Sequence, residues 1–298
     1  MRTRAKLDVI VAGEINVDLI LREAPPLELD KEFLAEGMDL ILGGSSSITA
    51  FNLARLGARV GFVGVVGEDT FGRYCAERLR WAGVDLQHLR WMAKEKTGIT
   101  VWLTRGARRA GVTFPGTIAM LRASDVPLEY LERAAHLHVG AYFFQKKLHA
   151  GARALFRRAR KIGLTTSLDT NYDPSELWDS GIRELLRETD IFFPNEDEAR
   201  RLTGLNSTGE AAEELRKLAR IVVVKQGAEG ALVASEGRTF RVPAIRVKAV
   251  EMTGAGDSFN AGFLSRFVRG GSLEECARAG VEAGARAVTR AGGTGAFE

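Results

Sequence analysis

The sequence predicts an α/β protein with a doubly wound, mostly parallel sheet, and three observations support this fold class. Short apolar runs alternate with segments of helical periodicity, as in parallel sheets covered by helices on both faces. Several of these runs end directly at polar side chains or glycine. The chain has 298 residues, 45% hydrophobic and 27% charged, which is enough to fill one large core. We therefore expect a single domain over residues 1–298.

The first elements along the chain are two strands. Residues 7–13 form an apolar run stopped by glycine, which indicates a buried strand. In residues 14–21, Asn16 and Asp18 fall on one face and apolar side chains on the other. Polar groups just past the end of a central strand are well placed to bind hydroxyls. An exposed strand face would give the same pattern, so both interpretations stand at this point.

A run of small residues follows at 43–47. Gly43, Gly44 and three serines precede a predicted helix over 48–56, which Gly57 closes. Small residues before a helix suggest a ligand near its N-terminus, although serines are also common in turns. Residues 58–67 read as another strand, whose glycine spacing is not that of a dinucleotide fingerprint. A helix ending near 82–83 follows.

A second, smaller sheet is predicted outside the main one. Residues 97–104 alternate like a strand, and 112–114 could be its hairpin partner. Residues 25–38 read as a loop and an exposed edge. We expect segments 15–42 and 97–115 to form this small sheet.

The second half of the chain alternates regularly. Strands are predicted at 137–140, 164–168, 191–193 and 221–225, with helices over 147–161 and 182–187 between them. Ligands of such sheets lie off the carboxyl ends of the strands. The polar residues expected at those ends are Asn16, Asp18, Asp169, Asn171, Asn195, Glu198 and Lys225.

The most informative stretch is Thr253-Gly254-Ala255-Gly256-Asp257. It leads into a helix whose phenylalanines, at 259, 263 and 267, share one face. The N-terminus of a helix presents unpaired N–H groups and suits a phosphate. A carboxylate beside a phosphate makes sense if Asp257 takes a proton from an attacking hydroxyl. The alternative is that Asp257 only caps the helix.

The composition of the chain and the motifs that it lacks argue against several classes of protein. The net charge of +4 is not gathered into a basic run, which argues against a nucleic-acid surface, and no window of 18 apolar residues suggests a membrane helix. Cys75 and Cys276 fit no metal spacing, and with no signal peptide pattern they favour a cytoplasmic protein. His136 and His138 share a strand face and could bind a metal, but no third ligand is near in sequence. No P-loop, nucleophile elbow or zinc protease motif is present.

Three separated segments resemble the ribokinase-like carbohydrate kinases, also called the phosphofructokinase-B family. Residues 253–263 are similar to the family's second signature. Gly43-Gly44, with 54–57 and 63–72, is similar to the first signature, and 194–198 to the N-x-x-E element. The likeness covers 9–295, essentially the whole chain.

The resemblance implies a fold, a reaction and site residues. The fold is a doubly wound domain with a small sheet as a lid, and the reaction is transfer of the ATP γ-phosphoryl group to a sugar hydroxyl with Mg²⁺. Asp257 matches the catalytic base, and the backbone of Gly254, Ala255 and Gly256 matches the anion hole. The matching ligand positions are Asn16, Asp18, Gly43 and Gly44 for the sugar, Asn195 and Glu198 for phosphates and Mg²⁺ through water, and Asn171, Lys225 and Gly227 for the nucleotide. A homodimer through the lid is also implied.

Two positions depart from the family pattern. Glu251 and Met252 stand where many members carry Asp-Thr, so activation by a monovalent cation is not expected. Ile48 replaces an asparagine that contacts the sugar in many members, so the sugar is not identified. Two other functions remain open: a nucleoside kinase, with Phe114, Tyr142 and Phe143 as a slot for the base, and a non-catalytic sugar- or nucleotide-binding regulator.

Overall fold

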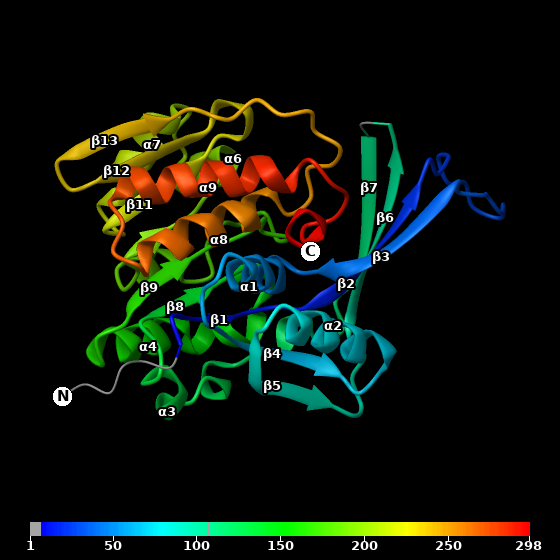
Figure 1. Ribbon diagram of the computed structural model, residues 1–298, viewed down its shortest axis with the longest axis horizontal. Helices are drawn as coiled ribbons and strands as arrows, with labels where there is room; N and C mark the ends of the chain where they lie inside the picture. The colour runs from blue at the N-terminus through cyan, green and yellow to red at the C-terminus, as the bar shows by residue number, and fades with distance from the viewer. Residues whose placement is uncertain (1–6, 107) are drawn as a thin grey trace.

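The structure is a computed structural model that describes residues 7–106 and 108–298, and it contains two sheets (Figure 1). The larger has nine strands in the order β13-β12-β11-β10-β9-β8-β1-β4-β5. Its seven strands from β11 to β5 are parallel, and β12 and β13 join one edge antiparallel. The predicted fold class is therefore confirmed. The strands are β1 (Val9–Ala12), β4 (Val60–Gly67), β5 (Asp85–Met92), β8 (His136–Val139), β9 (Thr165–Leu168), β10 (Ile191–Phe192), β11 (Ile221–Lys225), β12 (Ala231–Ser235) and β13 (Arg238–Val242).

Helices cover both faces of this sheet. Alternating side chains of β1 enter separate cores, with Val9 and Val11 on one face and Ile10 and Ala12 on the other. The first core is packed against α1 (Ser45–Arg55), α2 (Thr70–Trp81), α8 (Ala255–Phe267) and α9 (Leu273–Ala287). The second is packed against α4 (Lys146–Lys161), α5 (Ile182–Leu186), α6 (Glu196–Thr203) and α7 (Thr208–Arg216), and the short α3 (Leu128–Leu131) also lies on this side.

The smaller sheet projects from one end of the molecule (Figure 1). Its four strands are β2 (Asn16–Arg22), β3 (Gly37–Gly43), β6 (Gly98–Arg105) and β7 (Arg108–Phe114), in the order β3-β2-β6-β7. The predicted strand near 97–104 and its hairpin partner are thus present, and the partner is longer than predicted. β2 follows β1 after three residues, so the two sheets are directly joined.

Helix α1 begins at Ser45, three residues before the predicted start. The three serines form its first turn, and each hydroxyl finds an acceptor there. Ser46 Oγ donates to the buried Glu14 carboxylate at 2.5 Å, and Ser47 Oγ donates to the Gly44 carbonyl at 3.0 Å. The serine run is therefore helical, and not the flexible turn that was the alternative.

The two buried histidines bond to hydroxyls of the neighbouring strand. His136 contacts the hydroxyls of Thr165 and Ser167 at 2.7 Å each, and His138 contacts Ser167 at 2.8 Å. All four residues lie on the paired strands β8 and β9. Over the described residues, no group of three possible metal-binding side chains is found and no helix is long and apolar enough to cross a membrane.

Candidate active site

The N-terminus of α8 lies at the centre of the candidate site. Its N-cap, Gly254, has φ +74°, and a Cβ there would overlap the Cα of Gly293, so only glycine fits. The helix begins at Ala255, close to the predicted start. The first N–H groups of a helix lack intrahelical acceptors, although Ala255 N–H makes a long contact of 3.4 Å with the Met252 carbonyl. This turn therefore presents backbone donors toward the site.

Asp257 lies in the first turn of α8 and contacts α1. Its carboxylate accepts a hydrogen bond from Ser45 Oγ, and its backbone carbonyl accepts one from Thr49 Oγ1 at 3.3 Å. Protein atoms surround the Asp257 carboxylate on most sides, although the residue as a whole is only half-buried. This desolvation, with the negative charge of Asp169, raises the pKa of Asp257 to about 6, while Ser45 and Lys225 oppose the shift. A carboxyl with this pKa is ionised at neutral pH and can accept a proton.

A buried ion pair lies next to Asp257. Lys225 Nζ donates to Asp169 Oδ2 at 2.6 Å, and Asn260 Nδ2 donates to the same oxygen. Burial alone would raise the pKa of Asp169, but Lys225 and Asn260 hold it below its usual value. A Cβ on Gly256 would lie 3.4 Å from Lys225 Nζ, so the ammonium group sits against the α8 turn. The lysine thus places a positive charge where backbone donors also point.

Asn195 and Glu198 form a capping box at the start of α6. Asn195 Oδ1 accepts from Glu198 N at 2.9 Å, and Glu198 Oε2 accepts from Asn195 N at 2.9 Å. Burial, then the charge of Asp169, raises the pKa of Glu198 to about 7. A nearby cation would favour the ionised form of this carboxyl. With Asp169 close by, the residues fit Mg²⁺ held through water, since that ion keeps several waters in protein sites.

The residues predicted to bind the sugar come together where β2 meets β3. Asn16 Nδ2 donates to Asp18 Oδ1 at 3.0 Å. A Cβ on Gly43 would overlap the Asp18 carboxylate, and Gly44 has φ +88°, so both glycines are required sterically. Burial raises the pKa of Asp18 to about 7, and Asn16 and the Trp102 indole oppose the shift. Asn16 pairs with Gly43, and Ser45, two residues farther on, bonds to Asp257, so this chain segment links the polar pair to Asp257.

A cavity of about 460 Å³ lies on the other side of the α8 turn. Lys225, Gly227 and Gly256 line its polar end, and its remaining wall is largely apolar, with Ile245, Val247, Phe259, Val281 and Val288. Two of the three residues predicted at the nucleotide therefore border one cavity. Asn171 does not line it. It has φ +54°, and its Oδ1 accepts from Tyr172 N at 2.7 Å.

Three contacts at the site were not predicted from the sequence. Ser45 reaches Asp257 across 212 positions, and Asp169 joins Lys225 and Asn260. Asp169 was expected only at a strand end, and the serine run only near some ligand. Nothing in the spacing of these residues indicates which of them meet.

The aromatic slot considered for a nucleoside base is wrong. Tyr142 and Phe143 are buried in the core under α4, with 1% and 2% exposure. Phe114 pairs with Ile99, which places it on the face of the small sheet opposite Asp18. These three residues therefore do not meet beside the sugar-binding pair.

A helix start suited to a phosphate, next to a carboxylate that can take a proton, places this protein among the kinases of small alcohols. The chain belongs to the pfkB family of carbohydrate kinases, whose model matches residues 6–298. The family resemblance seen in the sequence is confirmed, and the protein is an ATP-dependent carbohydrate kinase.

Relatives with assigned substrates cover nearly the whole chain. The 2-dehydro-3-deoxygluconokinase of Bacillus subtilis is 30% identical, over 96% of this chain and 91% of that protein. The structure of Arabidopsis thaliana ribokinase with ribose and ATP has a TM-score of 0.84 at 26% identity, covering 97% of this chain and 95% of that one. The crystal structure of an E. coli protein provisionally named ribokinase II, in complex with ATP and Mg²⁺, has a TM-score of 0.88 at 24% identity, covering 98% of this chain and 96% of that one.

Proposed function

We propose that this protein transfers the γ-phosphoryl group of ATP to a hydroxyl of a small sugar or sugar-like alcohol, with Asp257 as the base. The observation that carries the proposal is the position of Asp257. Its carboxylate accepts a hydrogen bond from Ser45, two residues after the Gly43 that packs against Asp18, and Asp257 directly follows Gly256, which lines the cavity with Lys225. An acceptor on one side and a nucleotide on the other would meet at this carboxylate.

The proposed reaction needs few groups. The Asp257 carboxylate takes the proton of the acceptor hydroxyl, whose oxygen forms a bond to the γ-phosphorus as the bond to the β,γ-bridging oxygen breaks. The backbone of Gly254, Ala255 and Gly256 and the Lys225 ammonium face the charge of the transferring group. Asn195 and Glu198 would hold Mg²⁺ through water, and the ion would neutralise phosphate charge. Lys225 and Gly227 would contact the nucleotide; Asn171, outside the cavity wall, could meet it only beyond that cavity.

The small sheet is proposed to act as a lid within one catalytic domain of 1–298. Asn16, Asp18 and Gly43 lie on its strands, whereas Asp257 lies on the body. Closing the sheet over a sugar would therefore complete the site and exclude water from the phosphate.

A substrate panel with ADP release as the readout tests the proposed function. A neutral hexose, ribose, a sugar acid, a sugar phosphate and a nucleoside cover the acceptor classes. Sugar-dependent ADP release supports the kinase proposal. Preference for the nucleoside would favour the nucleoside kinase alternative, and ADP release from no acceptor, with sugar and ATP still bound, would favour a regulator.

The pH dependence follows from the raised pKa of Asp257. Because the base must be deprotonated, kcat/KM should increase with pH up to about 6 and then level off, falling roughly tenfold per unit below that value. Initial rates from pH 4.5 to 8 in buffers of constant ionic strength would measure the profile. A flat profile down to pH 4.5 would contradict the assignment of Asp257 as the base.

Activity should not require K⁺. Glu251, at the position where a cation-binding Asp would lie, is already engaged: Oε2 accepts from Gly292 N at 2.8 Å and Oε1 accepts from Thr253 Oγ1. Its carboxylate is therefore committed to the protein's own donors. Rates in KCl and in choline chloride at equal ionic strength should agree, and a large stimulation by K⁺ alone would show that the loop rearranges to bind it.

We also propose a homodimer through the outer face of the small sheet. The strand register places apolar side chains on the face of the small sheet that points away from Asp18. Two of them, Val112 and Met38, are 73% and 62% exposed. A second copy would cover this face. Sedimentation should show a dimer and Val112→Asp should shift it toward monomer. A monomeric wild type would refute this proposal.

A further inference from the structure

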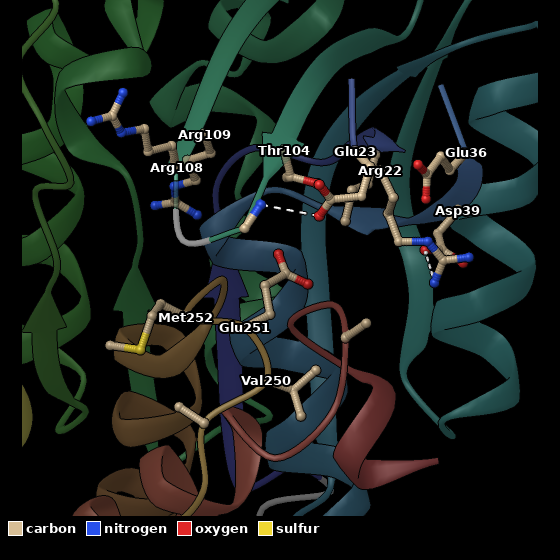
Figure 2. Close-up of a pocket in the computed structure, with 14 residues that line it drawn as sticks. Arg22, Glu23, Glu36, Asp39, Thr104, Arg108, Arg109, Val250, Glu251 and Met252 are labelled. Atoms are coloured by element: carbon tan, nitrogen blue, oxygen red, sulfur yellow. Dashed lines mark hydrogen bonds and ion pairs between the residues drawn. The ribbon is translucent and has the colours of Figure 1, made fainter. Parts of the chain in front are cut away.

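A second cavity, of about 750 Å³, lies between the small sheet and the loop before α8 (Figure 2). In Figure 2, Arg22, Thr104, Arg108 and Arg109 border it from the sheet, and Val250, Glu251 and Met252 face them from the loop. The strand register extends this wall from the sugar-binding pair, because Asp18 pairs with Thr100, and Arg109 lies opposite Thr104 farther along β6. The cavity therefore continues from Asp18 toward the tip of the small sheet.

Four carboxylates and three arginines line this cavity, and several of them are already engaged. Arg22 forms an ion pair with Asp39 at 3.3 Å, and Glu23 accepts from Gly106 N at 3.0 Å. Glu251 is bound to Gly292 N and Thr253. Glu36 lies near Arg22 and Asp39, away from Arg109 (Figure 2). Of the four carboxylates, Asp39 is paired with Arg22, and Glu23 and Glu251 accept from neutral donors, so none of the described ion pairs engages Arg109.

Arg109 differs because most of its donors remain available. The Arg109 guanidinium has five N–H groups. Among the described residues, one of them donates a hydrogen bond, to Thr253 Oγ1 at 2.9 Å. Its guanidinium carbon lies 4.7 Å from the centre of the Trp102 ring, a cation–π contact that helps hold the group in place. Among the described residues, its nitrogens have no carboxylate within 4.0 Å. A planar guanidinium held in this way suits a carboxylate or phosphate with two parallel hydrogen bonds.

We propose that the sugar substrate carries an anionic group, a carboxylate or a phosphate, at the end remote from the transferred hydroxyl, and that Arg109 binds it. The inference rests on the proposed kinase function. Trp102 would lie under the sugar, on the same sheet face as Asp18 and Arg109. Because Thr253 precedes Gly254, Arg109 is also linked to the turn that would receive the phosphoryl group. Arg108, which borders the same cavity, adds positive charge there.

Matched acceptors test the charge requirement. Fructose 6-phosphate is compared with fructose, and 2-keto-3-deoxygluconate with its uncharged methyl ester, each with ADP release as the readout. We expect kcat/KM for one anionic member to exceed that of its neutral partner by about 10- to 100-fold, the range for hydrogen bonds to a charged group. The pair that shows the preference identifies phosphate or carboxylate. Equal or better turnover of both neutral partners overturns the inference and leaves the kinase proposal intact.

The role of Arg109 is tested by substitution. In Arg109→Gln, KM for the anionic acceptor should increase about 10- to 100-fold, with little change in kcat or in KM for ATP. Arg109→Lys should recover part of the loss, because it keeps the charge without the forked geometry. Arg105→Gln is the control, since Arg105 is an exposed arginine of the same hairpin that does not line the cavity. Equal loss on charged and neutral acceptors would assign Arg109 a structural role and refute the proposal.

A binding measurement separates this inference from the reaction. Calorimetry of the same four compounds in the presence of ADP requires no turnover. Binding of an anionic member that Arg109→Gln weakens would support the inference even if no acceptor released ADP, an outcome that would refute only the kinase proposal. Absence of any preference for the charged compounds would overturn the inference.

Discussion

Asp257→Asn should lower kcat by about 10²- to 10⁴-fold, the contribution expected of a positioned general base. The change removes the proton acceptor, but it keeps the side-chain volume and an oxygen that can accept from Ser45 Oγ. The backbone donors of Gly254 and Gly256 are untouched, so the Kd for ATP should remain nearly unchanged. ADP release and calorimetry on one preparation would measure both quantities.

The stability change of this variant follows from the raised pKa of Asp257. The pKa of Asp257 is raised from 3.8 to about 6 in the folded protein, so its ionised form at pH 7 to 8 is less favourable folded than unfolded. This carboxyl favours folding only while protonated, and its contribution is lost as pH rises through about 6. A neutral asparagine should therefore leave the thermal midpoint at pH 8 unchanged or higher.

Asp69→Asn is the matched control for the cap interpretation. Asp69 is the N-cap of α2, and its carboxylate accepts from Gly72 N at 2.8 Å. Asparagine would still cap Gly72 N but would lose an acceptor for Thr97 N, which Asp69 Oδ2 binds at 2.8 Å, so that variant should lose stability with little effect on the chemical step. If Asp257→Asn instead kept its kcat, whatever its thermal midpoint, Asp257 would serve only the fold at the helix start and the proposed mechanism would be wrong.

Gly254→Val should lower kcat/KM by about a hundredfold or more, the effect of losing one donor at a developing anion. The residue has φ +74°, and a Cβ would overlap the Cα of Gly293, so the turn must shift. The shift would redirect the first N–H groups of α8 away from the phosphoryl group. Steady-state kinetics with both substrates varied would measure the loss.

Gly270→Val separates this effect from backbone strain alone. Gly270 lies just after the other end of α8 and also has a positive φ, of +80°. A Cβ at this position would meet no atom within 4 Å. Both variants incur the cost of a left-handed residue, about 1–2 kcal/mol. Only Gly254→Val should lose activity beyond its loss of stability, and similar kinetics in the two variants would contradict the anion-hole assignment.

The sequence predicted the elements that have a strong local pattern. The phenylalanines of α8 stack in order, with ring centres 6.4 and 6.3 Å apart, because residues four apart share a helix face. The strands from β8 to β11 were recognisable as apolar runs between helices. β5 was not predicted, because Arg90 and His88 interrupt its apolar pattern where it pairs with β4 only at the sheet edge. The β12–β13 hairpin was missed for a related reason, since its outer strand is mostly exposed.

The candidate site was predictable in its parts but not in its contacts. The glycine turn and Asp257 stand together in the sequence, so local chemistry was enough to single them out. The bonds of Ser45 to Asp257 and of Lys225 to Asp169 span 212 and 56 positions, and depend on how the helices pack. Asp169 follows β9 and Lys225 ends β11, and only the strand order brings those two ends into contact.

The separation of the small sheet from the nine-stranded sheet has an evolutionary consequence. The side chains proposed to recognise the acceptor lie on strands that are not hydrogen-bonded to the main sheet, whereas the proposed base and phosphate-facing backbone lie on α8. A lineage could therefore exchange one acceptor for another by point changes on β2, β6 or β7, without repacking the interior that maintains the chemistry. Kinases named for ribose and for 2-dehydro-3-deoxygluconate among its relatives are what such independent drift would produce.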